Sequence, residues 1–213
     1  MRYVIVDGGK SRSFSSGDAF LTRAVATLEA EIVVYLRGTE FHRDHTKLCI
    51  LVELDGECLG EHTGEAMGDE GSNVLGFARY RNGDDEPSKL IELVRQPATS
   101  EASLAVAKEL FEAAGLSVAV CADQAGRIID RLVRPKYNAA LRLLDEGLGS
   151  QKDIDLTCSL GLGYLDGPIE RTVRGGLAHH YDITLQLFEV YGTPGYAPAR
   201  RAMVAARRRE AGQ

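Results

Sequence analysis

The sequence of 213 residues contains no tryptophan, six prolines and only four cysteines. Cys49, Cys58, Cys121 and Cys158 are widely spaced and form no CxxC pair, so neither a zinc cage nor a disulfide framework is predicted. The longest apolar runs span a few residues, far short of the roughly 18 to 20 residues that cross a bilayer. We therefore expect reduced thiols in a cytoplasmic protein without a transmembrane helix, a membrane partner or a signal peptide.

Positive charge is also scarce. The chain has 25 Lys and Arg against 31 Asp and Glu, which gives a formal charge of −6 and a pI near 5.4. Duplex binding requires an accumulation of Lys and Arg, so nucleic acid is not expected as a partner. With 44% hydrophobic residues, 26% charged residues and a mean hydropathy of −0.15, the composition is typical of a soluble globular chain of one or two domains.

Strand signals fill the first 121 residues. Residues 3–6 are β-branched and continuous and are followed by Asp7-Gly8-Gly9, which predicts a buried parallel strand that ends in a turn. Apolar residues at helical spacing from Phe20 to Leu28 predict a helix after it. We expect further strands over 32–36, 48–54, 74–80, 89–94 and 117–121, and a helix over 101–114. The sheet is therefore predicted to be mixed and small.

After residue 121 only helices are predicted, over 126–147, 151–161, 168–174, 177–192 and 198–209. Ser150 and Asp153 stand where a capping box would begin the second of them. Pro135 predicts a bend in the first, because it removes one backbone hydrogen bond. The fold class is therefore α/β followed by all-α, with one domain over 1–121 and a second over 122–213.

The loop at residues 8–11 (GGKS) follows a first strand, as phosphate-binding loops do, but its spacing does not match them. A Walker A loop would need a glycine at Val4, and a dinucleotide fingerprint counted from Gly8 would need glycines at Lys10 and Ser13. The sequence therefore predicts an ordinary turn here, with no cofactor-binding residues.

Histidines form no metal-ligand pattern. His42 and His45 are three residues apart, but no helix or second ligand pair fixes them, so we expect a polar loop and no metal. His179 and His180 are adjacent in a predicted helix, where neighbours point about 100° apart. At most one of the two can face the interior.

Arg127, Arg131 and Arg134 recur at i, i+4 and i+7 and predict a basic stripe on one face of the helix that contains Pro135. Three guanidinium groups on one face suit the phosphates of an anionic ligand. The alternative is a surface stripe paired with neighbouring acidic residues.

Residues 118–132 (VAVCADQAGRIIDRL), then Pro135 and the segments 138–140 and 144–147, resemble the start of the C-terminal domain of 3-hydroxyacyl-CoA dehydrogenases. Segments 153–155, 160–164, 167–170 and 176–177 continue in the family's order and spacing. Upstream, 74–80 and 89–95 resemble the family's two strands before the domain junction. The resemblance implies a reduced Rossmann-like domain followed by the family's helical domain, which forms the dimer and one wall of the acyl-CoA cleft.

The resemblance also implies catalytic positions, and this sequence departs from them. The family's general-base histidine corresponds to Ala78, whereas the glutamate that orients it is retained as Glu92. The asparagine that helps to hold the substrate carbonyl corresponds to Asp130, and the glycine fingerprint is missing. Glu92 is the catalytic candidate, with a structural strand carboxylate as its alternative. The substrate-binding candidates are Asp130, Arg127, Arg131 and Arg134.

These departures favour a non-redox, dimeric, acyl-CoA-associated member of the family, or a companion of a fuller dehydrogenase chain in fatty or aromatic acid degradation. The alternative is an active NAD-dependent 3-hydroxyacyl-CoA dehydrogenase, and a third is a purely structural dimerisation module. We expect a homodimer with an acyl-CoA ligand, formed through the helical half, where residues 183–188 carry more apolar side chains than one helix stripe needs.

Overall fold

The computed structural model describes residues 1–27, 29–64 and 72–212. It divides into two compact units. We call Met1–Arg81 with Glu86–Arg127 the sheet unit, and Asn82–Asp85 with Ile128–Gln213 the helical unit. The sequence predicts a domain boundary between residues 121 and 122. In the structure, the last boundary between the two units along the chain lies between residues 127 and 128.

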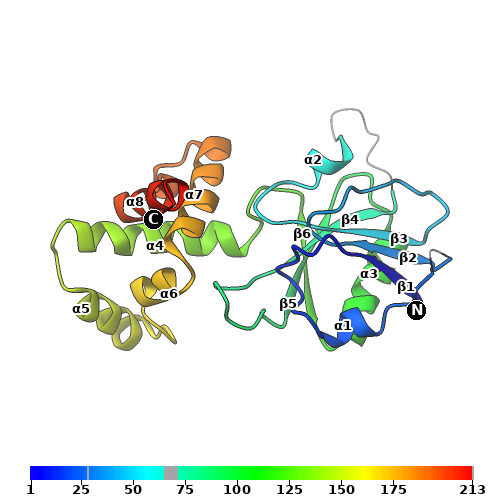
Figure 1. Ribbon diagram of the computed structural model, residues 1–213, viewed down its shortest axis with the longest axis horizontal. Coiled ribbons are helices and arrows are strands. Elements are labelled where there is room, and N and C mark those ends of the chain that lie inside the picture. The colour runs from blue at the N-terminus through cyan, green and yellow to red at the C-terminus, as the bar shows by residue number, and fades with distance from the viewer. Residues whose placement is uncertain (28, 65–71, 213) are drawn as a thin grey trace. The chain divides into compact units, whose positions relative to one another are not determined.

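The sheet unit contains six strands, which lie side by side in chain order (Figure 1). They are β1 Tyr3–Val6, β2 Ile32–Tyr35, β3 Cys49–Glu53, β4 Val74–Arg79, β5 Leu90–Arg95 and β6 Ser117–Ala122. Strands β1 to β4 are parallel, β5 is antiparallel to β4, and β6 is parallel to β5. The predicted mixed sheet is confirmed. Its described strands never reverse their order, whereas dinucleotide-binding sheets hold the ligand at such a reversal.

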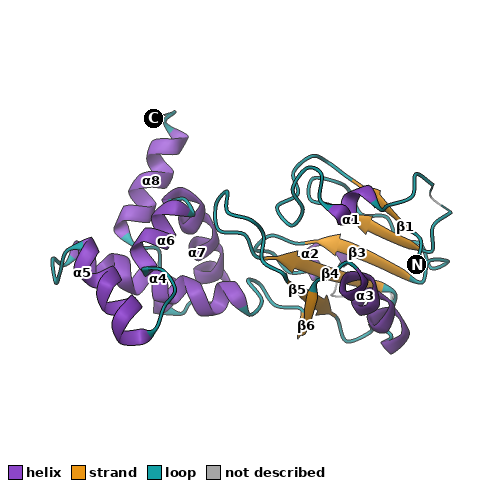
Figure 2. Cartoon of the chain, turned by 90° about the horizontal axis from the view of Figure 1, so that it is seen from below, coloured by secondary structure: helices purple, strands orange, loops and turns teal. Residues whose placement is uncertain are grey.

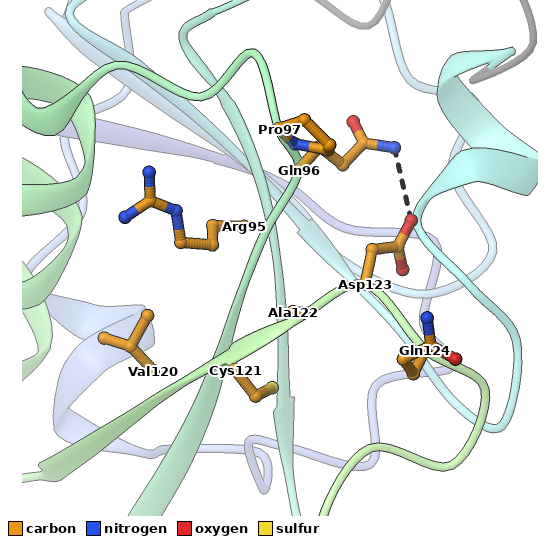
Figure 3. A pocket seen from close by; sticks show the side chains of 8 residues that line it. All are labelled: Arg95, Gln96, Pro97, Val120, Cys121, Ala122, Asp123 and Gln124. Carbon is orange, nitrogen blue, oxygen red and sulfur yellow. Dashed lines mark hydrogen bonds between the residues drawn. The ribbon is translucent and has the colours of Figure 1, made fainter.

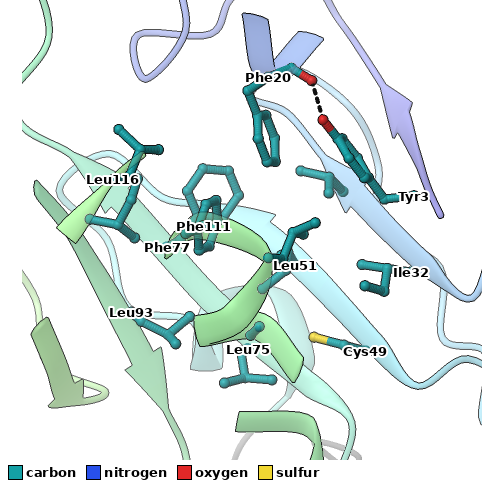
Figure 4. Packing of buried hydrophobic residues seen from close by; sticks show 14 of the residues in the cluster. Tyr3, Phe20, Ile32, Cys49, Leu51, Leu75, Phe77, Leu93, Phe111 and Leu116 are labelled. Atoms are coloured by element: carbon teal, nitrogen blue, oxygen red, sulfur yellow. Dashed lines mark hydrogen bonds between the residues drawn. The ribbon is translucent and has the colours of Figure 1, made fainter. Parts of the chain in front are cut away.

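Strands β2 to β4 are apolar at consecutive positions rather than alternate ones, which is typical of strands that are buried on both faces, whereas the residues of edge strand β6 are half-buried or exposed. Ile32 and Val34 contact one hydrophobic cluster, and Val33 and Tyr35 contact the other. Figure 4 shows the first cluster, where Phe20 packs 4.8 Å from the ring of Tyr3 and 5.5 Å from that of Phe111. Helix α3, Glu101–Ala113, contributes Ala107, Leu110 and Phe111 to this cluster.

The helix predicted from residue 20 to 28 is wrong beyond its first turn. Helix α1 covers only Ala19–Thr22 and begins with Asp18, whose carboxylate accepts from Phe20 N. The backbone N–H of Val25 then donates to Tyr3 O, on edge strand β1, so the chain is extended there instead of helical. Leu28 lies outside the described residues. A second short helix, α2, covers Gly60–Thr63.

The helical unit contains α4 Ile129–Asp145, α5 Gln151–Leu156, a π-helical turn Thr157–Gly161, α6 Pro168–Arg174, α7 Leu177–Tyr191, a 3-10 turn Pro194–Tyr196 and α8 Arg200–Glu210 (Figure 2). The predicted helical half is therefore confirmed. Ser150 caps α5, because its Oγ accepts from Asp153 N at 3.2 Å and lies 2.6 Å from Asp153 Oδ2. The sequence pattern predicted this pair.

The turn between β4 and β5 belongs to the helical unit, where it covers the end of α6. Asn82 Nδ2 donates to Arg171 O at 3.1 Å, and Arg174 Nε donates to Asp85 Oδ2 at 3.2 Å. A Cβ at Gly83 would lie 2.6 Å from Arg174 O, and the φ of Gly83 is +60°. Only glycine fits this approach of two backbones.

A buried polar network connects α4 and α7. His180 is 1% exposed, which confirms that at most one histidine of its pair faces the interior. Its Nε2 lies 2.9 Å from Asn138 Oδ1, and its Nδ1 lies 3.3 Å from Arg134 Nη1. Burial and the nearby Arg134 charge lower the pKa of His180 to about 3. The imidazole is therefore neutral in the folded protein at neutral pH.

This pKa predicts a loss of stability in acid. An unfolded histidine has a pKa of about 6.5, so below that pH the unfolded chain binds a proton that folded His180 does not bind until about pH 3. Between pH 6.5 and 4.5 the free energy of unfolding should fall by about 2 to 3 kcal/mol more than in His180→Gln. Urea unfolding followed by far-UV circular dichroism measures this difference. His179→Gln, at the half-buried neighbour, should keep the wild-type slope, and equal slopes for His180→Gln would contradict the assignment.

Candidate functional site

The pairing of β4 with β5 places Ala78 directly opposite Glu92. Opposite residues of an antiparallel pair have Cβ atoms about 5 Å apart, so a histidine at 78 would lie beside this carboxylate. Small residues surround the pair. Glu92 is flanked on its other side by Ala119, and a Cβ at Gly76 would lie 2.6 Å from the side chain of Leu54. The methyl group of Ala78 has no atom that could accept a proton.

Arg127 is the charged partner that the structure provides for Glu92. Both side chains are buried, and Arg127 Nε lies 3.8 Å from Glu92 Oε2. The guanidinium also donates to the backbone oxygens of Asp55 and Glu57. Arg127 Nε itself has no hydrogen-bond partner among the described residues. The pair neutralises two charges that would each be costly alone in the interior.

The basic stripe predicted for Arg127, Arg131 and Arg134 is wrong. Helix α4 begins only at Ile129, and Arg127 precedes it with a φ of +46°. Gly126, just before it, donates its backbone N–H to Gly56 O at 2.9 Å, which holds this turn against the loop after β3. The left-handed turn removes Arg127 from the helical repeat on which the prediction rested.

The other substrate-binding candidates lie in the helical unit. Asp130 Oδ1 accepts from Arg134 Nε at 2.7 Å, and both side chains are largely buried. Arg131 is exposed, and its guanidinium lies 4.5 Å from the ring centre of Tyr191. Of the three arginines, only Arg131 thus presents its charge to solvent. A substrate-binding role for these residues stays a prediction.

Sequence analysis missed Glu53, which ends β3 and is 4% exposed. Its Oε1 accepts from Ser11 Oγ, Arg12 N and Ser13 N, and its Oε2 accepts from Arg37 N. The loop after β1, which we tested for a phosphate site, thus binds a carboxylate of the protein itself. The only signal in the sequence was one charged residue at the end of an otherwise uncharged strand, CILVE.

A cavity of about 390 Å³ lies at the ends of β5 and β6 (Figure 3), lined by Arg95, Gln96, Pro97 and residues 120–124. Asp123 accepts from Leu59 N and Gly60 N, which begin α2, and from Gln96 Nε2 at 3.2 Å. Burial and the nearby Glu92 charge raise the pKa of Cys121 to about 11. The thiol is therefore protonated at neutral pH and is not an activated nucleophile.

Within residues 1–27, 29–64 and 72–212, no three His, Cys, Asp or Glu side chains are grouped so that they could hold a metal ion. His62 Nε2 lies 3.2 Å from Glu57 Oε1, and this hydrogen bond raises the pKa of His62. The two side chains form a pair at the surface. None of the helices in the described part of the chain is both long and apolar enough to cross a bilayer.

Residues 126–213 match the family described as 3-hydroxyacyl-CoA dehydrogenase, C-terminal domain. A mitochondrial hydroxyacyl-coenzyme A dehydrogenase of Homo sapiens is 37% identical over 82 residues, which cover 38% of this chain and 26% of the human protein. A 3-hydroxybutyryl-CoA dehydrogenase of Mycobacterium tuberculosis is 31% identical over 110 residues, which cover 51% of this chain and 38% of that protein. The chain thus spans well under half of the length of these relatives.

Two solved structures share the fold over most of the chain. M. tuberculosis FadB2 has a TM-score of 0.71 at 23% identity, over 86% of this chain and 67% of that one. The (S)-3-hydroxybutyryl-CoA dehydrogenase PaaH1 from Ralstonia eutropha has a TM-score of 0.69 at 20% identity, over 86% and 66%. The predicted fold class, a Rossmann-like sheet followed by a helical domain, is confirmed. The predicted resemblance is confirmed over residues 126–213, which match the C-terminal domain of the 3-hydroxyacyl-CoA dehydrogenase family.

Proposed function

We propose that this chain is a non-redox member of the 3-hydroxyacyl-CoA dehydrogenase family, a dimeric acyl-CoA-binding protein that acts in acyl-CoA degradation beside a fuller dehydrogenase chain. The observation that carries the proposal is the pairing of Ala78 with Glu92 and of Glu92 with Arg127. Oxidation of a 3-hydroxyl needs a base within hydrogen-bond reach of that proton. Ala78 is no base, and Glu92 is bound to a buried cation.

The proposed function uses no nicotinamide cofactor, and the arrangement at the carboxyl ends of β1 to β3 supports this part of the proposal. Dinucleotides bind where strand order reverses, beside backbone N–H groups that are free to meet a pyrophosphate. The described strands follow chain order, and the N–H groups of Arg12, Ser13 and Arg37 already donate to Glu53. A hydride acceptor would have to bind by another arrangement.

An active NAD-dependent 3-hydroxyacyl-CoA dehydrogenase is the second candidate. It is favoured by Glu92, which stands opposite the position of the family's base, and by a fold that follows FadB2 over 86% of the chain. In this case a base would have to come from a residue other than Ala78. NAD would then be the cofactor.

The dimeric part of the proposal rests on exposed apolar residues of the helical unit. Leu156, Leu160, Leu162 and Leu165 are exposed around α5 and the π-helical turn, beside a cavity of about 740 Å³. Such a cluster is typical of a protein interface. The predicted interface segment 183–188 differs, because Ile183 and Leu187 are buried within the helical unit itself. We therefore propose that the dimer interface lies at these four leucines. We also propose that the protein acts in the cytoplasm.

The purified protein should not oxidise NADH with acetoacetyl-CoA above a blank without enzyme. Ala78→His alone should not restore turnover, because Arg127 would still hold Glu92 and the cofactor site would still be lacking. A spectrophotometric assay at 340 nm measures this. Turnover of the unmodified protein at about 1 s⁻¹ or faster would overturn the proposal and favour the active dehydrogenase.

Isothermal titration should show binding of acetoacetyl-CoA and none of NADH. Because the charge of Arg131 is exposed, Arg131→Gln should weaken CoA-ester binding by about 5-fold and flatten its salt dependence. Arg207→Gln, at an exposed arginine of α8, is the matched control and should leave the affinity unchanged. Binding of neither ligand would favour the structural module.

Light scattering at micromolar concentration should give twice the chain mass of 23.1 kDa. A double substitution, Leu160→Glu with Leu165→Glu, should produce a monomer, because it places two charges at side chains that an interface would bury. Val190→Glu, at an exposed residue of α7, is the control and should remain dimeric. A monomeric wild-type protein would exclude the dimer.

A further inference from the structure

We infer that the loops after β1 and β2 form a carboxylate-binding cradle and that Glu53 is its built-in ligand, so that a small external carboxylate can bind there once the Glu53 side chain is removed. This inference concerns the carboxyl ends of β1 to β3. It does not depend on whether the chain turns over a hydroxyacyl-CoA.

The contacts of the Glu53 carboxylate are those of a bound anion. Oε1 accepts from Ser13 N at 2.8 Å, from Ser11 Oγ at 3.0 Å and from Arg12 N at 3.1 Å. Oε2 accepts from Arg37 N at 2.9 Å. Successive backbone N–H groups that converge on one oxygen are the arrangement by which backbone loops hold anions. All four donors are N–H or hydroxyl groups, and none is a charged side chain.

The register of the sheet explains why β3 supplies the ligand. Val6 pairs with Tyr35, and Tyr35 pairs with Val52, so Glu53, the last residue of β3, extends one position beyond the aligned ends of β1 and β2. A side chain at this position reaches both loops that leave β1 and β2. In parallel sheets this is the edge at which ligands bind.

The two loops that supply these donors are in backbone contact with each other. A Cβ at Gly8 would lie 2.6 Å from both C and O of Gly38, so the loops touch through their backbones. Buried N–H groups need an acceptor, and a missing one costs more than an ordinary hydrogen bond contributes. Glu53 meets this need for the buried Ser13 N–H and also accepts from the N–H groups of the half-buried Arg12 and Arg37.

The cradle fits a small planar carboxylate, since its donors address two oxygens on one carbon. Arg37 points its charge elsewhere, because its guanidinium lies 2.7 Å from Asp55 Oδ2. Formate and acetate are therefore the ligands to test. They match the end of the Glu53 side chain and fit the space that its truncation leaves.

Glu53→Ala should lower the melting temperature of the protein by roughly 6 to 12 °C, because four donors lose their acceptor. Sodium formate or acetate should then raise that temperature in proportion to the logarithm of its concentration, as a ligand of the folded state does. Sodium chloride at the same ionic strength should not. Equal effects of chloride and formate would overturn the inference.

Val52→Ala is the matched control. Val52 is the neighbouring residue of β3 and equally buried, but its truncation leaves an apolar space without anion donors. Formate should affect this variant no more than chloride does. A formate effect of the same size in both variants would be a general salt effect and would also overturn the inference.

Glu53→Gln provides a second test if Glu53→Ala unfolds in plain buffer. The amide still fills the cradle, so this variant should fold, should be less stable than the wild type and should gain nothing from formate. Glu53→Ala would then be refolded from urea in formate and in chloride. A higher yield of folded protein in formate supports the inference, and equal yields overturn it.

Discussion

The sheet unit depends on one constraint: the charge of a buried carboxylate has to be compensated by hydrogen-bond donors or by a cation. Glu53 accepts hydrogen bonds from backbone N–H groups and a serine hydroxyl, whereas Glu92 forms an ion pair with the Arg127 guanidinium. Asp123 is met by the first N–H groups of α2. Each of these contacts also fixes a loop, because the donors come from segments far away in sequence. Buried charge in this unit therefore determines where the connections between strands lie.

The same constraint distinguishes the site at Glu92 from a pair in which a carboxylate orients a histidine that abstracts a proton. A carboxylate orients a histidine only if its own charge is available to the imidazole. Here the carboxylate of Glu92 faces Arg127, and the position beside it holds a methyl group. The guanidinium neutralises the charge of the buried carboxylate. Glu92, to which the family resemblance assigns the orienting role, is thus part of a buried ion pair in this chain.

The strands and most helices could be predicted from sequence, because apolar side chains recur there with a regular period. The helix from residue 20 failed where Val25 donates to an edge strand, a long-range contact without a local signal. The prediction of an arginine stripe failed because the left-handed backbone of Arg127 takes this residue out of the helical repeat to which the other two arginines belong. Glu53 was missed because three of its four donors are backbone N–H groups, which every residue except proline carries. Ala78 could be predicted, since a resemblance aligns positions, but only the strand register shows what faces it.

Because the turn at Asn82–Asp85 belongs to the helical unit, the chain passes between the two units more than once. The chain leaves the sheet unit before Asn82, returns after Asp85 and leaves again after Arg127, so three covalent crossings join the units. A cut between Arg127 and Ile128 would leave the segment that covers the end of α6 attached to the sheet. The excised helical half would then expose the backbone oxygen of Arg171 and lose the partner of Arg174 at Asp85. The boundary of the family match at residue 126 thus does not coincide with the boundaries of the compact helical unit.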